Sequence, residues 1–199
     1  SSAKALRTIQ QRHLKDMDSD FRVLGVIRPS TETIGAYSKT KHIGILGTEG
    51  TVNSNSYAIE LNKFCSGVFV TQQACPMWVP LIESNKHMSE KGKAIIKGDF
   101  IDLIKKDPEI DTVLLACTHY PIIASYLENI SEGSVKIISQ GPIIAQKLKD
   151  YFRRHKKIHN QITRNGDCEF LTTANSEIFN KSAESFLSIN VNSSQVKIS

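Results

Sequence analysis

The chain has 199 residues, 40% of them hydrophobic, and a formal net charge of +5. This length and composition allow one large domain or two small ones with a packed core. No apolar stretch approaches the roughly 20 residues of a membrane span, and the first residues lack the apolar segment of a signal peptide, so we expect a soluble, cytoplasmic protein with no membrane partner.

Short apolar runs alternate with helical segments along the chain, which indicates a parallel α/β sheet. Predicted strands lie at 22–27, 42–47, 67–72, 112–117, 136–140 and, in a shorter form, 169–172. Predicted helices lie at 1–15, 30–38, 54–64, 88–106, 121–130, 142–155 and 175–189. The strands are rich in Val, Ile and Leu, as expected when helices cover both faces of a sheet. The polar tail over 188–199 is expected to fray.

The positive charge is densest over residues 153–157, at the end of the helix predicted over 142–155. Cations are favoured there by the helix dipole. No aromatic residues are interleaved with the run, and no nucleic-acid motif accompanies it. We therefore expect a solvated helix end and no nucleic-acid partner.

Two predicted strands end in segments that could bind a ligand, because open α/β sheets bind ligands at the carboxyl ends of their strands. Strand 42–47 runs into a Gly- and Thr-rich turn with hydroxyls at Thr48 and Thr51, where the glycines allow close backbone approach to a carboxylate. The turn lacks the ending of a phosphate loop and could equally be structural. Strand 67–72 runs into a segment that ends at Glu83, which is either a general acid/base partner or the first polar residue of a surface loop.

The four cysteines are scattered and form no CxxC pair, so neither a disulfide framework nor a metal site is predicted. Cys117 ends a predicted strand just before a helix, where backbone N–H groups favour a thiolate. His119 lies two residues further on and could exchange a proton with it. The alternative is a small buried side chain, which is the expectation for Cys75.

These segments together resemble the glutamate racemases of the Asp/Glu racemase superfamily. The resemblance rests on the sequences DTVLLACTHYPII, HIGILGTEGTVNSNSY and ACPMWVPLIE, and it extends in one register over about residues 1–187. It implies an α/β fold of two pseudo-symmetric domains, with mostly parallel sheets flanked by helices and the active site in the cleft between them. We expect residues 28–135 to form the complete domain, and residues 1–27 with 136–199 to form the remainder of the other.

The resemblance also implies roles for single residues. Cys117 matches the second catalytic cysteine, and His119 and Glu83 match the groups that assist it. Thr48, Thr51, Thr118 and His119 match substrate contacts. The substrate would be glutamate, with no pyridoxal phosphate, no metal and no other cofactor, and the product D-glutamate would serve peptidoglycan synthesis. The oligomeric state is left open, with a homodimer as one possibility.

Two motifs of the family do not occur in the 199 residues: the early Asp-Ser-Gly-x-Gly-Gly and the Ala-Cys-Asn-Thr that carries the first catalytic cysteine. The chain also opens in a predicted helix with no strand before it. We therefore expect it to be the larger part of an intact racemase and, alone, to be inactive in full racemisation. Two alternatives are a racemase of aspartate or a related amino acid, and a non-catalytic module that binds a dicarboxylate.

Overall fold

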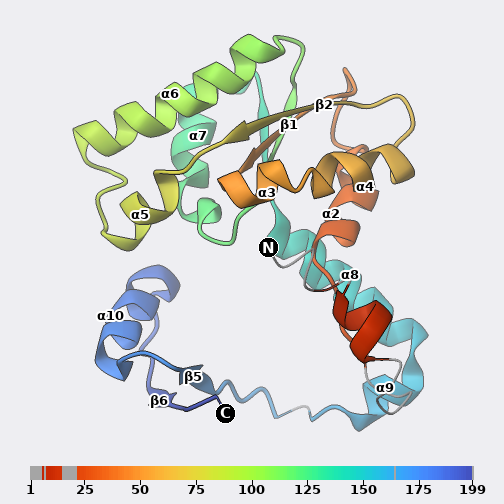
Figure 1. Ribbon diagram of the computed structural model, residues 1–199, viewed down its shortest axis with the longest axis vertical. Helices are drawn as coiled ribbons and strands as arrows, with labels where there is room; N and C mark the ends of the chain where they lie inside the picture. The colour runs from red at the N-terminus through yellow and green to blue at the C-terminus, as the bar shows by residue number, and fades with distance from the viewer. Residues whose placement is uncertain (1–5, 7, 15–21, 164, 199) are drawn as a thin grey trace. The chain divides into compact units, whose positions relative to one another are not determined.

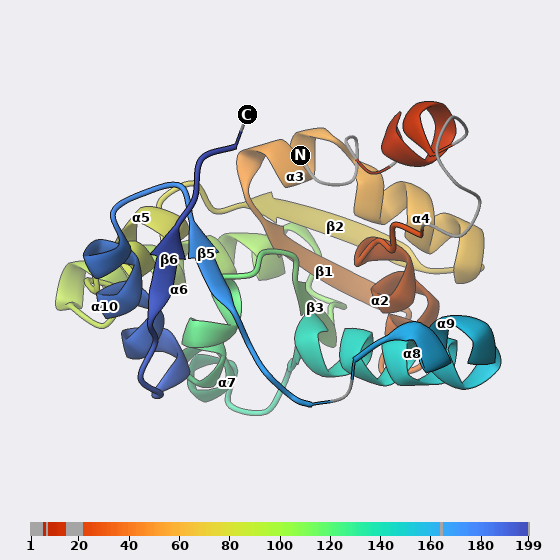
Figure 2. The same cartoon turned by 90° about the horizontal axis from the view of Figure 1, so that it is seen from below.

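The computed structural model describes residue 6 and residues 8–14, 22–163 and 165–198, and it divides the chain into two compact units, residues 1–150 and 151–199. The first unit contains a four-stranded parallel sheet in the order β2-β1-β3-β4. Its strands are β1 (His42–Gly47), β2 (Phe69–Ala74), β3 (Thr112–Leu115) and β4 (Lys136–Ser139). Figure 2 shows β2, β1 and β3 side by side in that order. The predicted α/β class with a parallel sheet is confirmed.

Helices cover both faces of this sheet, as the continuous apolar strands predict. On one face α2 (Ile27–Ile34), α4 (Ser56–Phe64) and α8 (Gln140–Arg154) bury Ile34, Leu61 and Ile143 against the sheet. On the other face lie α6 (Glu90–Lys106) and α7 (Ala124–Ser131) (Figure 1). A Cβ atom at Gly44 would lie 2.8 Å from Leu103 of α6, so glycine permits the close approach of this helix.

Short helices connect the strands at their carboxyl ends. They are α3 (Glu49–Asn53) after β1, α5 (Trp78–Glu83) after β2, and the 3₁₀ helix η2 (Tyr120–Ile123) after β3. These three connections position the candidate site.

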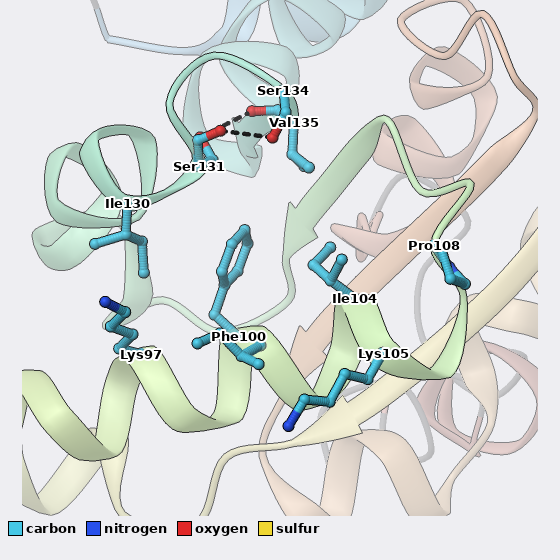
Figure 3. Close-up of a pocket in the computed structure, with 10 residues that line it drawn as sticks. Lys97, Phe100, Ile104, Lys105, Pro108, Ile130, Ser131, Ser134 and Val135 are labelled. Carbon is cyan, nitrogen blue, oxygen red and sulfur yellow. Dashed lines mark hydrogen bonds between the residues drawn. The ribbon is translucent and has the colours of Figure 1, made fainter.

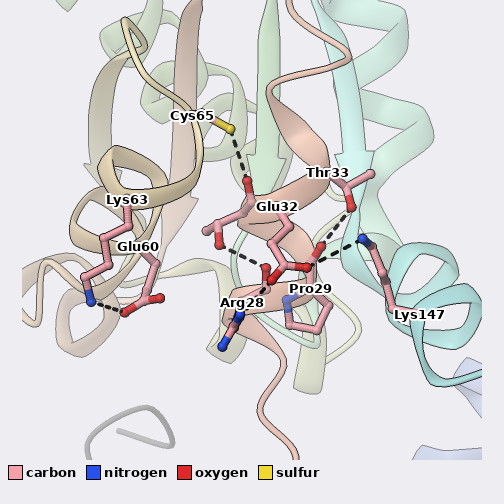
Figure 4. A network of polar contacts seen from close by, with 9 residues as sticks. Arg28, Pro29, Glu32, Thr33, Glu60, Lys63, Cys65 and Lys147 are labelled. Carbon is pink, nitrogen blue, oxygen red and sulfur yellow. Dashed lines mark hydrogen bonds and ion pairs between the residues drawn. The ribbon is translucent and has the colours of Figure 1, made fainter. Parts of the chain in front are cut away.

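Polar contacts fasten α2 to α8 (Figure 4). The Glu32 carboxylate accepts a hydrogen bond from Arg28 Nε at 2.8 Å and pairs with Lys147 Nζ of α8 at 3.5 Å. The hydrogen bond from Arg28 lowers the pKa of Glu32 most, and the positive charges of Arg28 and Lys147 lower it further. Since all three side chains are at least 30% exposed, each pair is expected to contribute only about 0–1 kcal/mol.

The second unit contains a two-stranded parallel sheet of β5 (Phe170–Thr172) and β6 (Ser193–Gln195). Helix α10 (Ser176–Leu187) connects the strands, and α9 (Lys156–Gln161) precedes them. The basic residues 153–157 are exposed around the end of α8, as predicted.

Several sequence predictions differ from the structure. The strand predicted over 22–27 is not found: residues 22–25 have no strand ladder, and α2 begins at Ile27. The tail expected to fray contains β6, whose Ser193 N–H donates to Asn180 Oδ1 at 3.0 Å. The helix predicted over 1–15 is described only at Leu6 and residues 8–14, where a π-helix η1 spans Ile9–His13; the remainder lies outside the described residues.

Strand β4 pairs with β3 in the first unit's sheet, with Leu115 opposite Ser139. The assignment of residues 28–135 to a complete domain stays a prediction. The pairing of segments 1–27 and 136–199 in one domain, its pseudo-symmetry and the cleft stay predictions.

Candidate active site

The predicted site residues lie at the carboxyl edge of the four-stranded sheet. Strand β2 lies on one side of β1 and β3 lies on the other, so the order of the strands reverses at β1. Such a switch point is where open α/β sheets bind ligands. Leu46 is opposite Leu115, so Thr48 and Cys117, each two residues further on, leave neighbouring strands at the same edge.

A thiol, an imidazole and a carboxylate form a chain of contacts at this edge. Cys117 Sγ lies 3.9 Å from His119 Nδ1, and His119 Nε2 lies 3.1 Å from Glu83 Oε1. Cys117 is half-buried, whereas the Glu83 side chain is 61% exposed. An imidazole in this position can take a proton from the thiol, and the carboxylate can orient the ring. The structure thus brings together the three predicted catalytic residues.

The turn after β3 and the segment after β2 are joined by one buried tyrosine. The Tyr120 hydroxyl donates to the Cys75 carbonyl at 3.0 Å, and its ring packs on Trp78 with 4.7 Å between the ring centroids. Both aromatic side chains are fully buried. Trp78 begins α5, which ends at Glu83, so this contact helps to hold Glu83 opposite His119.

The Gly- and Thr-rich turn after β1 forms the N-terminus of α3. Thr48 is the N-cap residue: its hydroxyl accepts a hydrogen bond from the Thr51 N–H at 3.3 Å and lies 3.0 Å from the Thr51 hydroxyl. A Cβ at Gly47 would lie 3.1 Å from Thr51 Cγ2, so glycine lets the first turn of α3 fold back onto β1. Both threonines are half-buried and Thr118 is exposed. Their substrate contacts stay predictions.

Cys75 is fully buried, and burial raises the pKa of its thiol far above the usual range, so the prediction of a core residue is confirmed. Among the described residues no three His, Cys, Asp or Glu side chains are grouped to hold a metal ion. Nor does any described helix combine the length and the apolar character that crossing a membrane requires.

Sequence reasoning missed two residues next to the site, Tyr57 and Gln140. Tyr57 lies on α4 and is 3% exposed; its hydroxyl donates to Gln140 Oε1 at 2.9 Å. Burial raises the pKa of Tyr57 to about 12, although the Gln140 contact opposes this, and the charge of Cys117 raises it further. Gln140 directly follows β4, so the strand-end rule that selected Cys117 could have selected Gln140 as well.

A hollow lies away from the predicted site residues (Figure 3). It has a volume of about 410 Å³ and is formed mainly by apolar side chains of α6 and α7. Pro108 and Val135, which precede β3 and β4, also line it. None of the predicted site residues lines it.

Comparisons with known proteins identify the family of the chain. No protein-family model matches the chain. A glutamate racemase of Carnobacterium sp. (strain St2) is 32% identical over 190 residues, which are 93% of this chain and 69% of that protein. The chain belongs to the glutamate racemase family. It spans about two thirds of the length of the curated relatives that it matches.

Solved structures of the family have the same fold. Glutamate racemase RacE1 of Bacillus anthracis superimposes with a TM-score of 0.81 at 29% identity, covering 94% of this chain and 68% of that one. The Francisella tularensis racemase, solved in complex with D-glutamate, gives a TM-score of 0.77 at 23% identity, covering 98% of this chain and 72% of that one. The resemblance first seen in the sequence motifs is thereby confirmed.

Proposed function

We propose that the full-length protein interconverts L- and D-glutamate without a cofactor and that Cys117 is its acid/base group on one face of the substrate. The observation that carries this proposal is the chain of contacts from Cys117 through His119 to Glu83 at the switch point of a racemase-family sheet. It is supported by relatives named glutamate racemase and by the D-glutamate in the Francisella tularensis structure.

The chemistry explains why these groups are needed. Inverting the α-carbon requires a base on one face and an acid on the other. In our proposal the Cys117 thiolate removes the α-proton of L-glutamate. A second thiol, which is not among the site residues named above, delivers a proton to the opposite face. In the reverse direction the Cys117 thiol delivers the proton. His119 and Glu83 set the protonation state of Cys117 between turnovers.

Hydrogen bonds that are already in place stabilise the carbanion-like charge formed during proton transfer. We propose that Thr48, Thr51, Thr118 and His119 contact the two carboxylates of glutamate. The threonine pair is held by the N-cap of α3, and the N-terminus of a helix favours an anion. By family membership the product would serve peptidoglycan synthesis in the cytoplasm. The homodimer stays a prediction, which light scattering would test.

The test incubates the full-length protein with L-glutamate and, separately, with L-aspartate, and follows the optical signal of each by circular dichroism. We expect loss of the signal for glutamate alone, and no loss with Cys117→Ser. Inversion of aspartate but not glutamate would overturn the substrate assignment. No inversion of either amino acid, with glutamate still protecting Cys117 from alkylation, would favour a dicarboxylate-binding module instead.

A further inference from the structure

Gln140, the first residue of α8, connects α4 and α2 to β3, the strand that precedes Cys117. Its Oε1 accepts hydrogen bonds from Tyr57 of α4 at 2.9 Å and from Ser30 of α2 at 3.0 Å. Its Nε2 donates to the carbonyl of Leu115 at 3.0 Å. Gln140 itself is the residue after the edge strand β4.

The orientation of the Gln140 amide is fixed by these partners. Leu115 offers only a carbonyl oxygen here, so it must face the NH₂ group, and the hydroxyls then face Oε1. Ser30 has a single hydroxyl proton, and the Val26 carbonyl, also at 3.0 Å, competes for it. Tyr57 has no second acceptor among its described contacts, so it is the more constant donor.

The carbonyl that Gln140 holds lies just before the reacting turn. On the same peptide group, the Ala116 N–H donates to the Leu46 carbonyl at 2.8 Å. The peptide bond between Leu115 and Ala116, which directly precedes Cys117 in the chain, is thus held by Gln140 on one side and by β1 on the other. The contacts of Gln140 therefore bear on the backbone that directly precedes the thiol.

We propose that Gln140 is a positioning residue for Cys117: by holding the Leu115 carbonyl and the Tyr57 hydroxyl together, it sets the direction in which the thiol points. This inference rests on the proposed function in one respect only, namely the effect that Gln140 would have on glutamate turnover. The positioning itself is a property of the folded chain, and it can be measured without substrate.

The test measures the rate of iodoacetamide alkylation at each cysteine of the full-length protein by peptide mass spectrometry, from about pH 6 to pH 9, a range that brackets the ordinary thiol. Exposed Cys168 is the internal reference. In Gln140→Met, which loses all three side-chain hydrogen bonds of Gln140, we expect the Cys117 to Cys168 rate ratio to change by at least about threefold, the effect of one lost hydrogen bond.

Two further variants separate the contacts. Gln140→Glu keeps the acceptors for Tyr57 and Ser30 but cannot donate to Leu115, and its added negative charge should move the pH midpoint of Cys117 alkylation upward. Tyr57→Phe removes the more constant donor and should shift the ratio in the same sense as Gln140→Met, by less. Ser30→Ala is the matched control, with the smallest change expected.

The inference is overturned if the pH profile of Cys117 alkylation in Gln140→Met superimposes on that of the wild type while the melting temperature falls. Gln140 would then have a merely structural role. If Gln140→Met does not fold, an unchanged profile in Tyr57→Phe overturns it equally. Failure of the proposed function is read separately, from glutamate turnover by the wild type, because substrate does not enter the alkylation ratio.

Discussion

Replacing Tyr120 by Phe removes one buried hydroxyl between the two segments of the candidate site. The bond to the Cys75 carbonyl is lost, while the ring packing on Trp78 is kept. The Cys75 carbonyl still accepts from the Trp78 N–H at 3.3 Å, so it is not left without a partner. We therefore expect the unfolding free energy to fall by about 1 kcal/mol, the net contribution of one ordinary hydrogen bond.

The assay is urea unfolding followed by the fluorescence of Trp78, the single tryptophan of the sequence. A loss of about 1 kcal/mol should lower the urea midpoint by about 0.3–1 M with an unchanged slope. The matched control is Tyr126→Phe, whose hydroxyl donates to the Lys93 carbonyl at 3.2 Å from a half-buried position and should matter less. A loss in Tyr120→Phe no greater than in the control, or above about 3 kcal/mol, would refute this reasoning.

Three further substitutions test other parts of the structure. Leu114→Ala, in the fully buried strand β3, should cost about 2–5 kcal/mol in the same urea assay. Thr48→Ala should cost about 1 kcal/mol through loss of the N-cap of α3, and Thr48→Ser should restore most of it. Burial alone would raise the pKa of Asp111, but hydrogen bonds from Ser38 and from backbone N–H groups outweigh it and lower the pKa to about 2. This lies below the unfolded value of about 3.9, so the stabilisation is present above pH 4 and is lost as the pH falls toward 2. Acid titrations should therefore show a shallower loss of stability in Asp111→Asn over that window.

The sequence predicted the central strands well because burial on both faces leaves a continuous apolar signature. Strand β1 spans His42–Gly47, the bounds that the sequence predicted. The same signature was wrong at residues 22–25, since apolar residues do not form a strand without a neighbouring ladder. It also missed β6, whose three residues are too short and polar to show any period.

The site was predicted in two different ways. The strand-end rule selected Cys117 and Thr48, whereas the pairing of Glu83 with His119 came from the family resemblance alone. Nothing local to Glu83 shows that α5 will bring it to within 3.1 Å of an imidazole 36 positions away. The strand-end rule could also have selected Gln140, but its hydrogen-bond partners could not be predicted, because they lie on three separate elements.

The most direct test of the central claim is the rate at which the full-length protein incorporates deuterium at the α-carbon of L-glutamate in D₂O, followed by proton NMR. Wild type and Cys117→Ser are compared under identical conditions. If Cys117 removes the α-proton, exchange proceeds in the wild type and falls by at least about 100-fold in the variant, the lower range for loss of a general base. Equal rates in the two proteins would contradict the account, because another group would then be the base.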